Sequence, residues 1–259
     1  MDLGIAGKKA IVGGASAGLG KACATSLARE GCELIIVART KADIEASAAE
    51  IGAATGAKVT PVAVDINSDE GRAAILAICP EPDIIVYNSG GPPTGSFRDW
   101  DRQKWAEALN MSMLGPIFMI KEVVDGMIAR KFGRIINVTS HSVKAPIQVL
   151  GLSTSARLGL TGYVAGVARE VAKHGVTINN LLPGEFDTER HRSNTRAMAK
   201  LQNRTFEEMR TIRMGQVAMG RFGDPAEFGE ICAFICSVQA GYITAQNILI
   251  DGGKYPGTF

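Results

Sequence analysis

A glycine-rich turn near the N-terminus constrains the fold of this chain more than any other feature. Residues 9–12 have the pattern of a short buried strand, residues 21–29 have helical spacing, and between them lies Gly13-Gly14-Ala15-Ser16-Ala17-Gly18-Leu19-Gly20. Glycine adopts backbone angles that other residues resist, and a bare backbone lets a diphosphate approach the N–H groups at a helix start. A glycine cluster alone can also be an ordinary tight turn. The flanking strand and helix, with a further strand at 33–37, favour a nucleotide-binding unit.

Alternation of strands and helices continues along the chain and predicts the fold class. Strands are expected at 9–12, 33–37, 58–64, 83–87, 134–138, 177–182 and 247–250, and helices at 21–29, 43–54, 70–78, 102–130, 155–173 and 225–238. Such an order forms a parallel sheet covered by helices on both faces. Pro116 should kink the long helix at 102–130. The sequence therefore predicts one α/β domain over residues 1–259, with a doubly wound, seven-stranded parallel sheet of the Rossmann type.

Composition and charge narrow the classes of function. The chain has 28 Lys and Arg residues and 26 Asp and Glu residues, which gives a net charge of +2. The basic residues are scattered along the sequence. This pattern does not favour binding to nucleic acid or to an anionic membrane, and no run of 18 apolar residues occurs. The five cysteines form no CxxC pair, and the three histidines lie far apart in the sequence. We therefore expect buried reduced thiols, no metal centre and a cytoplasmic location.

Several motifs occur in the order of one known family. They are the glycine turn with Gly14, Gly18 and Gly20 in register, Asp65 closing the third expected strand, Tyr87-Asn88-Ser89-Gly90, Pro183-Gly184 followed by Thr188, and Asp251-Gly252-Gly253. Together they resemble the short-chain dehydrogenase/reductase family, in particular its 3-oxoacyl-ACP reductases, over roughly residues 5–253. The resemblance implies hydride transfer between a nicotinamide cofactor and a carbonyl or alcohol substrate.

The resemblance also implies which residues contact the cofactor. These are Gly14, Ser16, Gly18, Leu19, Gly20, Arg39, Thr40, Asp65, Ile66, Asn88, Gly90, Arg157, Pro183, Gly184, Phe186 and Thr188. Ala38 stands where NAD-preferring relatives carry an acid for the ribose 2′-hydroxyl, and Arg39 follows it. A guanidinium suits a 2′-phosphate, although an exposed loop arginine is the plainer interpretation. We expect the cofactor to be NADP.

Four positions match the catalytic tetrad of the family. Asn110 and Ser140 correspond to its asparagine and serine, whereas Ser153 and Arg157 replace the tyrosine and lysine of Tyr-x-x-x-Lys. A serine hydroxyl is a far weaker acid than a phenol, and its shorter side chain is expected to hold a water in the volume of the missing ring. Arg157 lies on the same helix face as Ser153 and is expected to supply charge and bond the ribose.

The source of the reaction's proton and the plainer roles of these residues stay open. The proton could come from Ser140, His141, a water relayed by Ser153, or the substrate. Asn110 could be a solvent-facing helix residue, Ser140 a turn cap and Asp65 the first residue of an Asx turn.

Three functions remain open on the sequence alone. The first, which we favour, is an NADPH-dependent reductase of ketones or 3-oxoacyl groups acting on a small carbonyl or alcohol compound. The second is a cofactor-binding sensor or partner subunit without turnover. The third is a dehydratase or isomerase on the same scaffold.

Residues 185–219 form a polar stretch that matches the family's variable substrate lid. Its arginines Arg190, Arg192 and Arg196 could meet an acidic substrate or a phosphopantetheine arm, or form a solvated helix face. The resemblance further implies a homotetramer, since relatives assemble through two of their helices and the C-terminal strand.

Overall fold

Seven parallel strands form the centre of the structure, a computed structural model that describes residues 1–258. The strands are β1 (Lys9–Gly13), β2 (Glu33–Ala38), β3 (Val59–Ala63), β4 (Ile84–Tyr87), β5 (Gly133–Val138), β6 (Val176–Pro183) and β7 (Asn247–Ile250). Their order in the sheet is β3-β2-β1-β4-β5-β6-β7, so the winding reverses between β1 and β4. Ligands of such folds bind at the carboxyl edge beside this reversal. The predicted doubly wound, single-domain α/β fold is confirmed.

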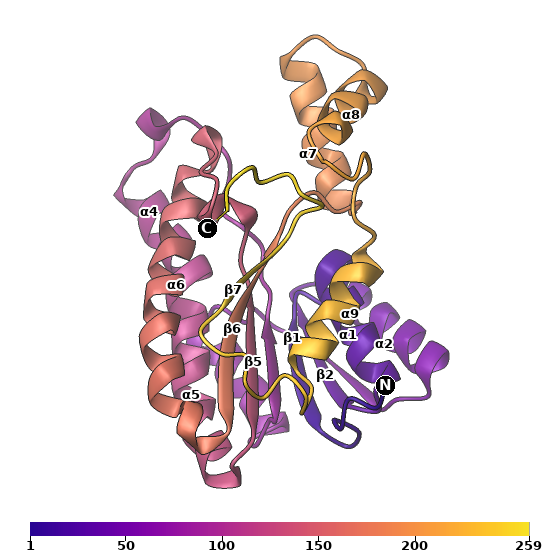
Figure 1. Ribbon diagram of the computed structural model, residues 1–259, viewed down its shortest axis with the longest axis vertical. Helices are drawn as coiled ribbons and strands as arrows, with labels where there is room; N and C mark the ends of the chain where they lie inside the picture. The colour runs from indigo at the N-terminus through magenta and orange to yellow at the C-terminus, as the bar shows by residue number, and fades with distance from the viewer. Residues whose placement is uncertain (259) are drawn as a thin grey trace.

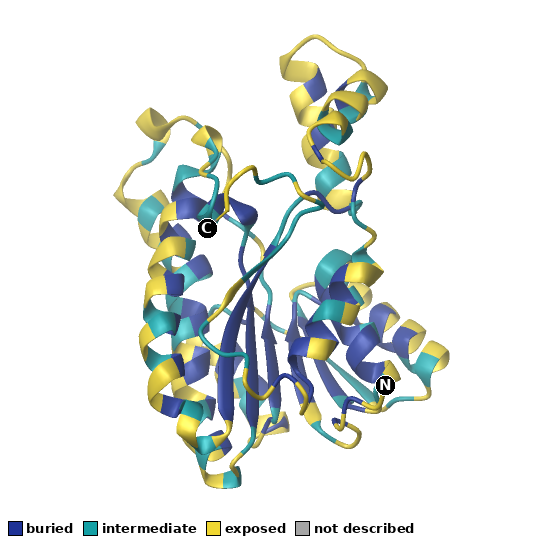
Figure 2. Cartoon of the chain, in the orientation of Figure 1, coloured by how far each residue is buried: buried dark blue, intermediate teal, exposed yellow. Residues whose placement is uncertain are grey.

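Helices cover both faces of the sheet (Figure 1). On one face lie α1 (Gly18–Arg29), α2 (Lys41–Thr55) and α9 (Pro225–Ile235), and on the other α3 (Asp69–Ile78), α5 (Gly115–Arg130) and α6 (Gly151–Val171). Each face has its own apolar cluster, with Phe228 and Leu27 in one and Met119 and Ile75 in the other. In Figure 2 the strands are buried, and the helix faces that point away from the sheet are exposed. Burial of each such side chain stabilises the fold by about 1.5–3 kcal/mol.

The long helix expected at 102–130 is divided in three. It consists of α4 (Arg102–Leu109), a π-helical turn (Asn110–Leu114) and α5. The N–H of Gly115 donates to the carbonyl of Asn110, five residues back, and Pro116 follows with no N–H to give. Pro116 is thus associated with a widened turn, and this turn begins at Asn110.

Helix α6 begins at Gly151, earlier than the residue 155 that we expected. A Cβ atom at Gly151 would lie 2.5 Å from the Trp100 ring, so glycine lets the helix start against this ring. Ser153 therefore lies inside the helix. Helix α9 ends at Ile235 rather than at 238, because the N–H of Val238 donates instead to the carbonyl of Leu3.

The polar stretch contains two helices, α7 (Glu189–Leu201) and α8 (Phe206–Gly215). Thr188 and Thr205 cap their N-termini through side-chain hydroxyls. Drawn in orange in Figure 1, both helices project beyond the carboxyl edge of the sheet. The described residues also contain short 3-10 turns at Phe97–Asp99, His141–Val143, Gln148–Leu150 and Ala172–His174.

Two kinds of feature are absent from the described residues 1–258. None of their helices combines the length and apolar character that a bilayer span needs. No group of three or more His, Cys, Asp or Glu side chains there is arranged to hold a metal ion. All five cysteines are buried and free.

Candidate active site

The glycine turn and the loop after β4 meet at the carboxyl edge of the sheet. Gly14 and Gly18 have φ angles of +59° and +56°, a region that favours glycine. A Cβ atom at Gly14 would lie 2.6 Å from Nδ2 of Asn88, and one at Gly20 would overlap the carbonyl oxygen of Gly14. Asn88 donates to the carbonyls of Gly13 and Gly14, at 3.3 and 3.5 Å. The packing therefore requires the bare backbone that a diphosphate could approach.

The start of α1 leaves N–H groups available at this cradle. Its N-cap residue, Ala17, has no side chain that could accept a hydrogen bond from them. Such groups, together with the positive end of the helix dipole, favour an anion. The residues present thus fit the diphosphate of a dinucleotide.

Arg39 and Thr40 lie exposed at the end of β2. Within residues 1–258, neither side chain makes a hydrogen bond or ion pair, and the same holds for the half-buried Ser16. Asp65, by contrast, accepts from the backbone N–H and the side-chain amide of Asn67, at 2.9 and 2.7 Å. Asp65 therefore forms an Asx turn and keeps its second carboxylate oxygen free. Ile66 packs in the core beside it.

The remaining cofactor candidates lie along the same edge. Thr188 is close to the glycine turn, since a Cβ atom at Gly18 would lie 3.4 Å from its methyl group. Gly184 packs tightly against Asp251, and Phe186 is buried against Phe228. Leu19 lies on α1, Gly90 in the loop after β4, and Pro183 at the end of β6.

Ser153 and Arg157 are in contact, one helical turn apart on α6. Nε of Arg157 donates to Oγ of Ser153 at 3.1 Å, and Nη1 donates to the carbonyl oxygen of Val138 at 2.8 Å. Val138 ends β5. The guanidinium is thus held against the carboxyl end of the strand that leads to Ser140, with N–H groups still unused.

Ser140 and Asn110 are hydrogen-bonded to other neighbours. Oγ of Ser140 accepts from the N–H of Ser142 at 3.1 Å, and Nδ2 of exposed Asn110 donates to the carbonyl of Asn67 at 3.5 Å. Ser140 therefore does cap a turn, as its plainer interpretation holds. Its own hydroxyl hydrogen remains free to bond a ligand.

Burial and the nearby charge of Arg190 lower the pKa of Arg157 to about 10. Its guanidinium therefore stays charged at neutral pH. Burial, and next the charge of Lys254, lower the pKa of His141 from its ordinary value of 6.5. His141 is accordingly neutral at pH 7 and is a poor source of a proton.

Comparison with known proteins decides the family. Residues 14–254 match the family described as "Enoyl-(Acyl carrier protein) reductase". A 3-oxoacyl-[acyl-carrier-protein] reductase of Vibrio cholerae is 33% identical over 259 residues, covering 98% of this chain and 99% of that protein. The chain belongs to the short-chain dehydrogenase/reductase family. An acetoacetyl-CoA reductase of Allochromatium vinosum is 28% identical, covering 95% of this chain and 98% of that protein.

Solved structures of two reductases superpose closely on this one. YwfH, an NADPH-dependent reductase involved in bacilysin biosynthesis, has a TM-score of 0.92 at 27% identity, covering 97% of this chain and 100% of that one. L-sorbose reductase from Gluconobacter frateurii, solved with NADPH and L-sorbose, has a TM-score of 0.92 at 26% identity, covering 98% of both chains. This short-chain dehydrogenase/reductase is therefore an oxidoreductase by family, as the motifs predict.

Glu185, directly after the Pro183-Gly184 motif, is a buried carboxylate that the sequence analysis missed. It accepts from Nε2 of His191 at 2.6 Å and is ion-paired with Arg213 and Lys254. Burial alone would raise the pKa of Glu185, but the bonds from His191 and Lys254 hold it well below its ordinary 4.5. The carboxylate joins the end of β6 to α7, α8 and the C-terminal segment. No local pattern predicts this, because Arg213 and Lys254 lie 28 and 69 residues further along the chain.

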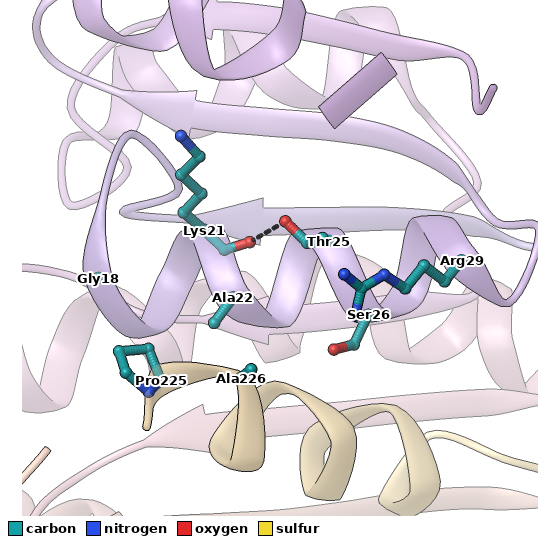
Figure 3. Close-up of a pocket in the computed structure, with 8 residues that line it drawn as sticks. All are labelled: Gly18, Lys21, Ala22, Thr25, Ser26, Arg29, Pro225 and Ala226. Carbon is teal, nitrogen blue, oxygen red and sulfur yellow. Dashed lines mark hydrogen bonds between the residues drawn. The ribbon is translucent and has the colours of Figure 1, made fainter. Parts of the chain in front are cut away.

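A hollow between α1 and α9 shares Gly18 with the glycine turn but extends along α1 away from the other site residues (Figure 3). Its cations are already paired, Lys21 with Glu50 and Arg29 with Glu230. The hollow thus offers no free charge to an anionic ligand, and we do not assign the active site to it.

Proposed function

We propose that this family member is an NADPH-dependent ketoreductase in which Ser153 and Arg157 replace the usual tyrosine and lysine. The observation that carries the proposal is the charged guanidinium of Arg157, held at the carboxyl end of β5 and bonded to Ser153. Similar proteins whose names specify NADPH-dependent or 3-oxoacyl reduction support the same chemistry.

The chain's residues suggest how the cofactor would be held. The bare backbone at Gly14 and Gly18 would accept the diphosphate, and Arg39 with Thr40 and Ser16 would face the adenosine ribose. Thr188, the N-cap residue of α7, would contact the diphosphate beside Gly18. When bound, NADPH would supply the hydride that is transferred to the carbonyl carbon.

The protein's part is to bind and polarise the carbonyl oxygen. The free hydroxyl hydrogen of Ser140 would donate to it, and Arg157 would stabilise the negative charge that develops there. Because Ser153 accepts a charge-assisted bond from Arg157, its own hydrogen is available for a water that carries the proton. The product alcohol gains a hydride at carbon and a proton at oxygen.

Binding without turnover is the second candidate function. It is favoured by the protonation states at the site, since Arg157 holds its proton and His141 is neutral. NADPH fluorescence titration beside an NADPH oxidation assay with a carbonyl panel distinguishes the two. Tight binding with no oxidation above the uncatalysed rate for every carbonyl would overturn the ketoreductase proposal.

Arg39→Ala should lower the affinity for NADPH at least about tenfold and leave the affinity for NADH nearly unchanged. A charge-assisted contact to the 2′-phosphate contributes about 1.5–3 kcal/mol, which corresponds to this factor or more. Fluorescence titrations of both cofactors measure it. Lys41→Ala is a matched control, because that neighbouring cation is already paired with Glu45. Equal NADPH affinity in wild type and Arg39→Ala would exclude Arg39 as the phosphate ligand.

A small carbonyl substrate, a cytoplasmic location and a homotetramer remain part of the proposal. Light scattering at micromolar concentration should give a mass about four times 27.4 kDa. A mass near 27.4 kDa would contradict the tetramer.

A further inference from the structure

The arginines of α7 differ in whether their charge is already paired. Arg192 is ion-paired with Asp187 and Glu189, at 2.8 and 3.1 Å, and Arg196 with Glu189 at 2.8 Å. These pairs fit the interpretation of a solvated helix face for those two side chains. Arg190 is the exception, since within residues 1–258 it forms no ion pair and no hydrogen bond.

The acids nearest to Arg190 in the sequence are engaged elsewhere. Asp187 and Glu189 bind the neighbouring arginines, and Glu185 is held by His191, Arg213 and Lys254. The positive charge of Arg190 is therefore not neutralised by an acid of α7 or of the residues just before it.

Arg190 points back from α7 to the loop that follows β4. A Cβ atom at Gly91 would lie 2.8 Å from Nη2 of Arg190 and 3.6 Å from the central carbon of its guanidinium. A side chain at Gly91 would make the guanidinium shift from this position. The guanidinium thus lies beside Gly91, in the loop whose Asn88 contacts the glycine turn.

A second cation, Arg157, lies near enough to Arg190 to interact with its charge. Arg157 has no carboxylate partner in the described residues, and its bonds go to neutral oxygens of Ser153 and Val138. The pKa of Arg157 is lowered by burial and then by the charge of Arg190, so the two guanidinium groups repel each other. Two like charges without an acid are stabilised when an anion binds between or beside them.

We propose that Arg190 binds an oxyanion of the substrate, and that the preferred substrates are therefore small oxo acids with a carboxylate close to the carbonyl group. A planar guanidinium bonds a carboxylate through two parallel N–H donors. Proximity to Arg157 favours an anion near the reacting carbonyl over the phosphate of a pantetheine arm, which lies at the far end of that chain. This inference rests on the proposed function, because it takes the space beside Arg157 to be the substrate site.

The test compares two acids with their neutral esters. Calorimetric titrations use full-length enzyme saturated with NADP⁺, so that no reduction occurs, and the probes are acetoacetate, 2-oxobutyrate and their methyl esters. We expect at least one acid to bind wild type about tenfold or more tighter than its ester, and Arg190→Gln to remove that advantage. Arg196→Gln, which alters a paired arginine on the same helix, should leave it intact.

Further measurements separate the sources of the anion. NADPH affinity should be the same in Arg190→Gln as in wild type; a tenfold loss would assign Arg190 to the cofactor's phosphates and overturn the proposal. Equal binding of acids and esters by wild type, or an acid preference that persists in Arg190→Gln, would also overturn it. NADPH oxidation with the methyl esters tests the ketoreductase function separately, since the esters do not need Arg190. Turnover of the esters without any acid preference would leave the reductase standing and remove the inference alone.

Discussion

Arg157→Ala should lower kcat/KM for an accepted ketone by about a hundredfold to a thousandfold, because a preorganised donor at a developing oxyanion contributes about 2.7–4 kcal/mol. Arg157 is the charged group that β5 and Ser153 fix at the carboxyl edge. Arg157→Lys should retain much more activity, since it keeps a cation there. Steady-state kinetics with NADPH oxidation provide the measurement.

Folding must be controlled in this experiment, because Arg157 also bonds the carbonyl of Val138. Thermal unfolding of each variant shows whether the fold persists, and NADPH titration shows whether the cofactor site does. Ser153→Ala removes the hydroxyl and leaves the bond to Val138, so it separates the two contacts. Full activity in a folded Arg157→Ala enzyme would show that the charge comes from another residue and that the active site is misplaced.

Glu185→Gln should lower the free energy of unfolding by about 3–5 kcal/mol, the usual cost of removing one partner of a buried ion pair. The substitution leaves three polar partners, His191, Arg213 and Lys254, around a neutral amide. Denaturant unfolding at pH 7 measures the change. Glu189→Gln is a suitable control, because Glu189 is also ion-paired on α7 but is exposed, and it should change stability little.

The effect of Glu185 should also depend on pH in a defined direction. Its pKa in the folded protein lies well below the ordinary 4.5, so the carboxylate's stabilisation is complete above about pH 4.5 and declines as pH falls below that value. The stability difference between wild type and Glu185→Gln should therefore shrink between about pH 5 and pH 3, because the unfolded chain binds about one proton more than the folded protein there. A difference that stays constant over this range would contradict the assigned charge of Glu185.

Most of the fold could be predicted because its signals are local. The strand expected at 247–250 has the observed bounds, and the strand expected at 33–37 differs from β2 by one residue. Helix ends were less predictable, since they depend on distant contacts. The start of α6 depends on Trp100 packing over Gly151, and the end of α9 on the carbonyl of Leu3.

In the candidate site, too, local placement could be predicted from the sequence and distant contacts could not. The spacing of four residues predicts that Ser153 and Arg157 share one helix face, and the hydrogen bond between them agrees with this. The bond itself was not predicted, since the helix was expected to begin only at residue 155. The network around Glu185 joins residues up to 69 positions apart, and no periodicity connects them. Likewise, nothing in the sequence distinguishes Arg190 from Arg192 and Arg196, and only three-dimensional pairing shows that Arg190 differs.

Hydride transfer itself is the most direct test of the ketoreductase proposal. The enzyme is incubated with NADPH deuterated at the C4 position of the nicotinamide, using both C4 epimers, and with a panel of ketones and oxo acids. Products are analysed by mass spectrometry and NMR. We expect one epimer to transfer deuterium to the carbinol carbon of the product alcohol, and Arg157→Ala to slow this transfer. Saturating NADPH binding without deuterated alcohol from any carbonyl would contradict the proposal.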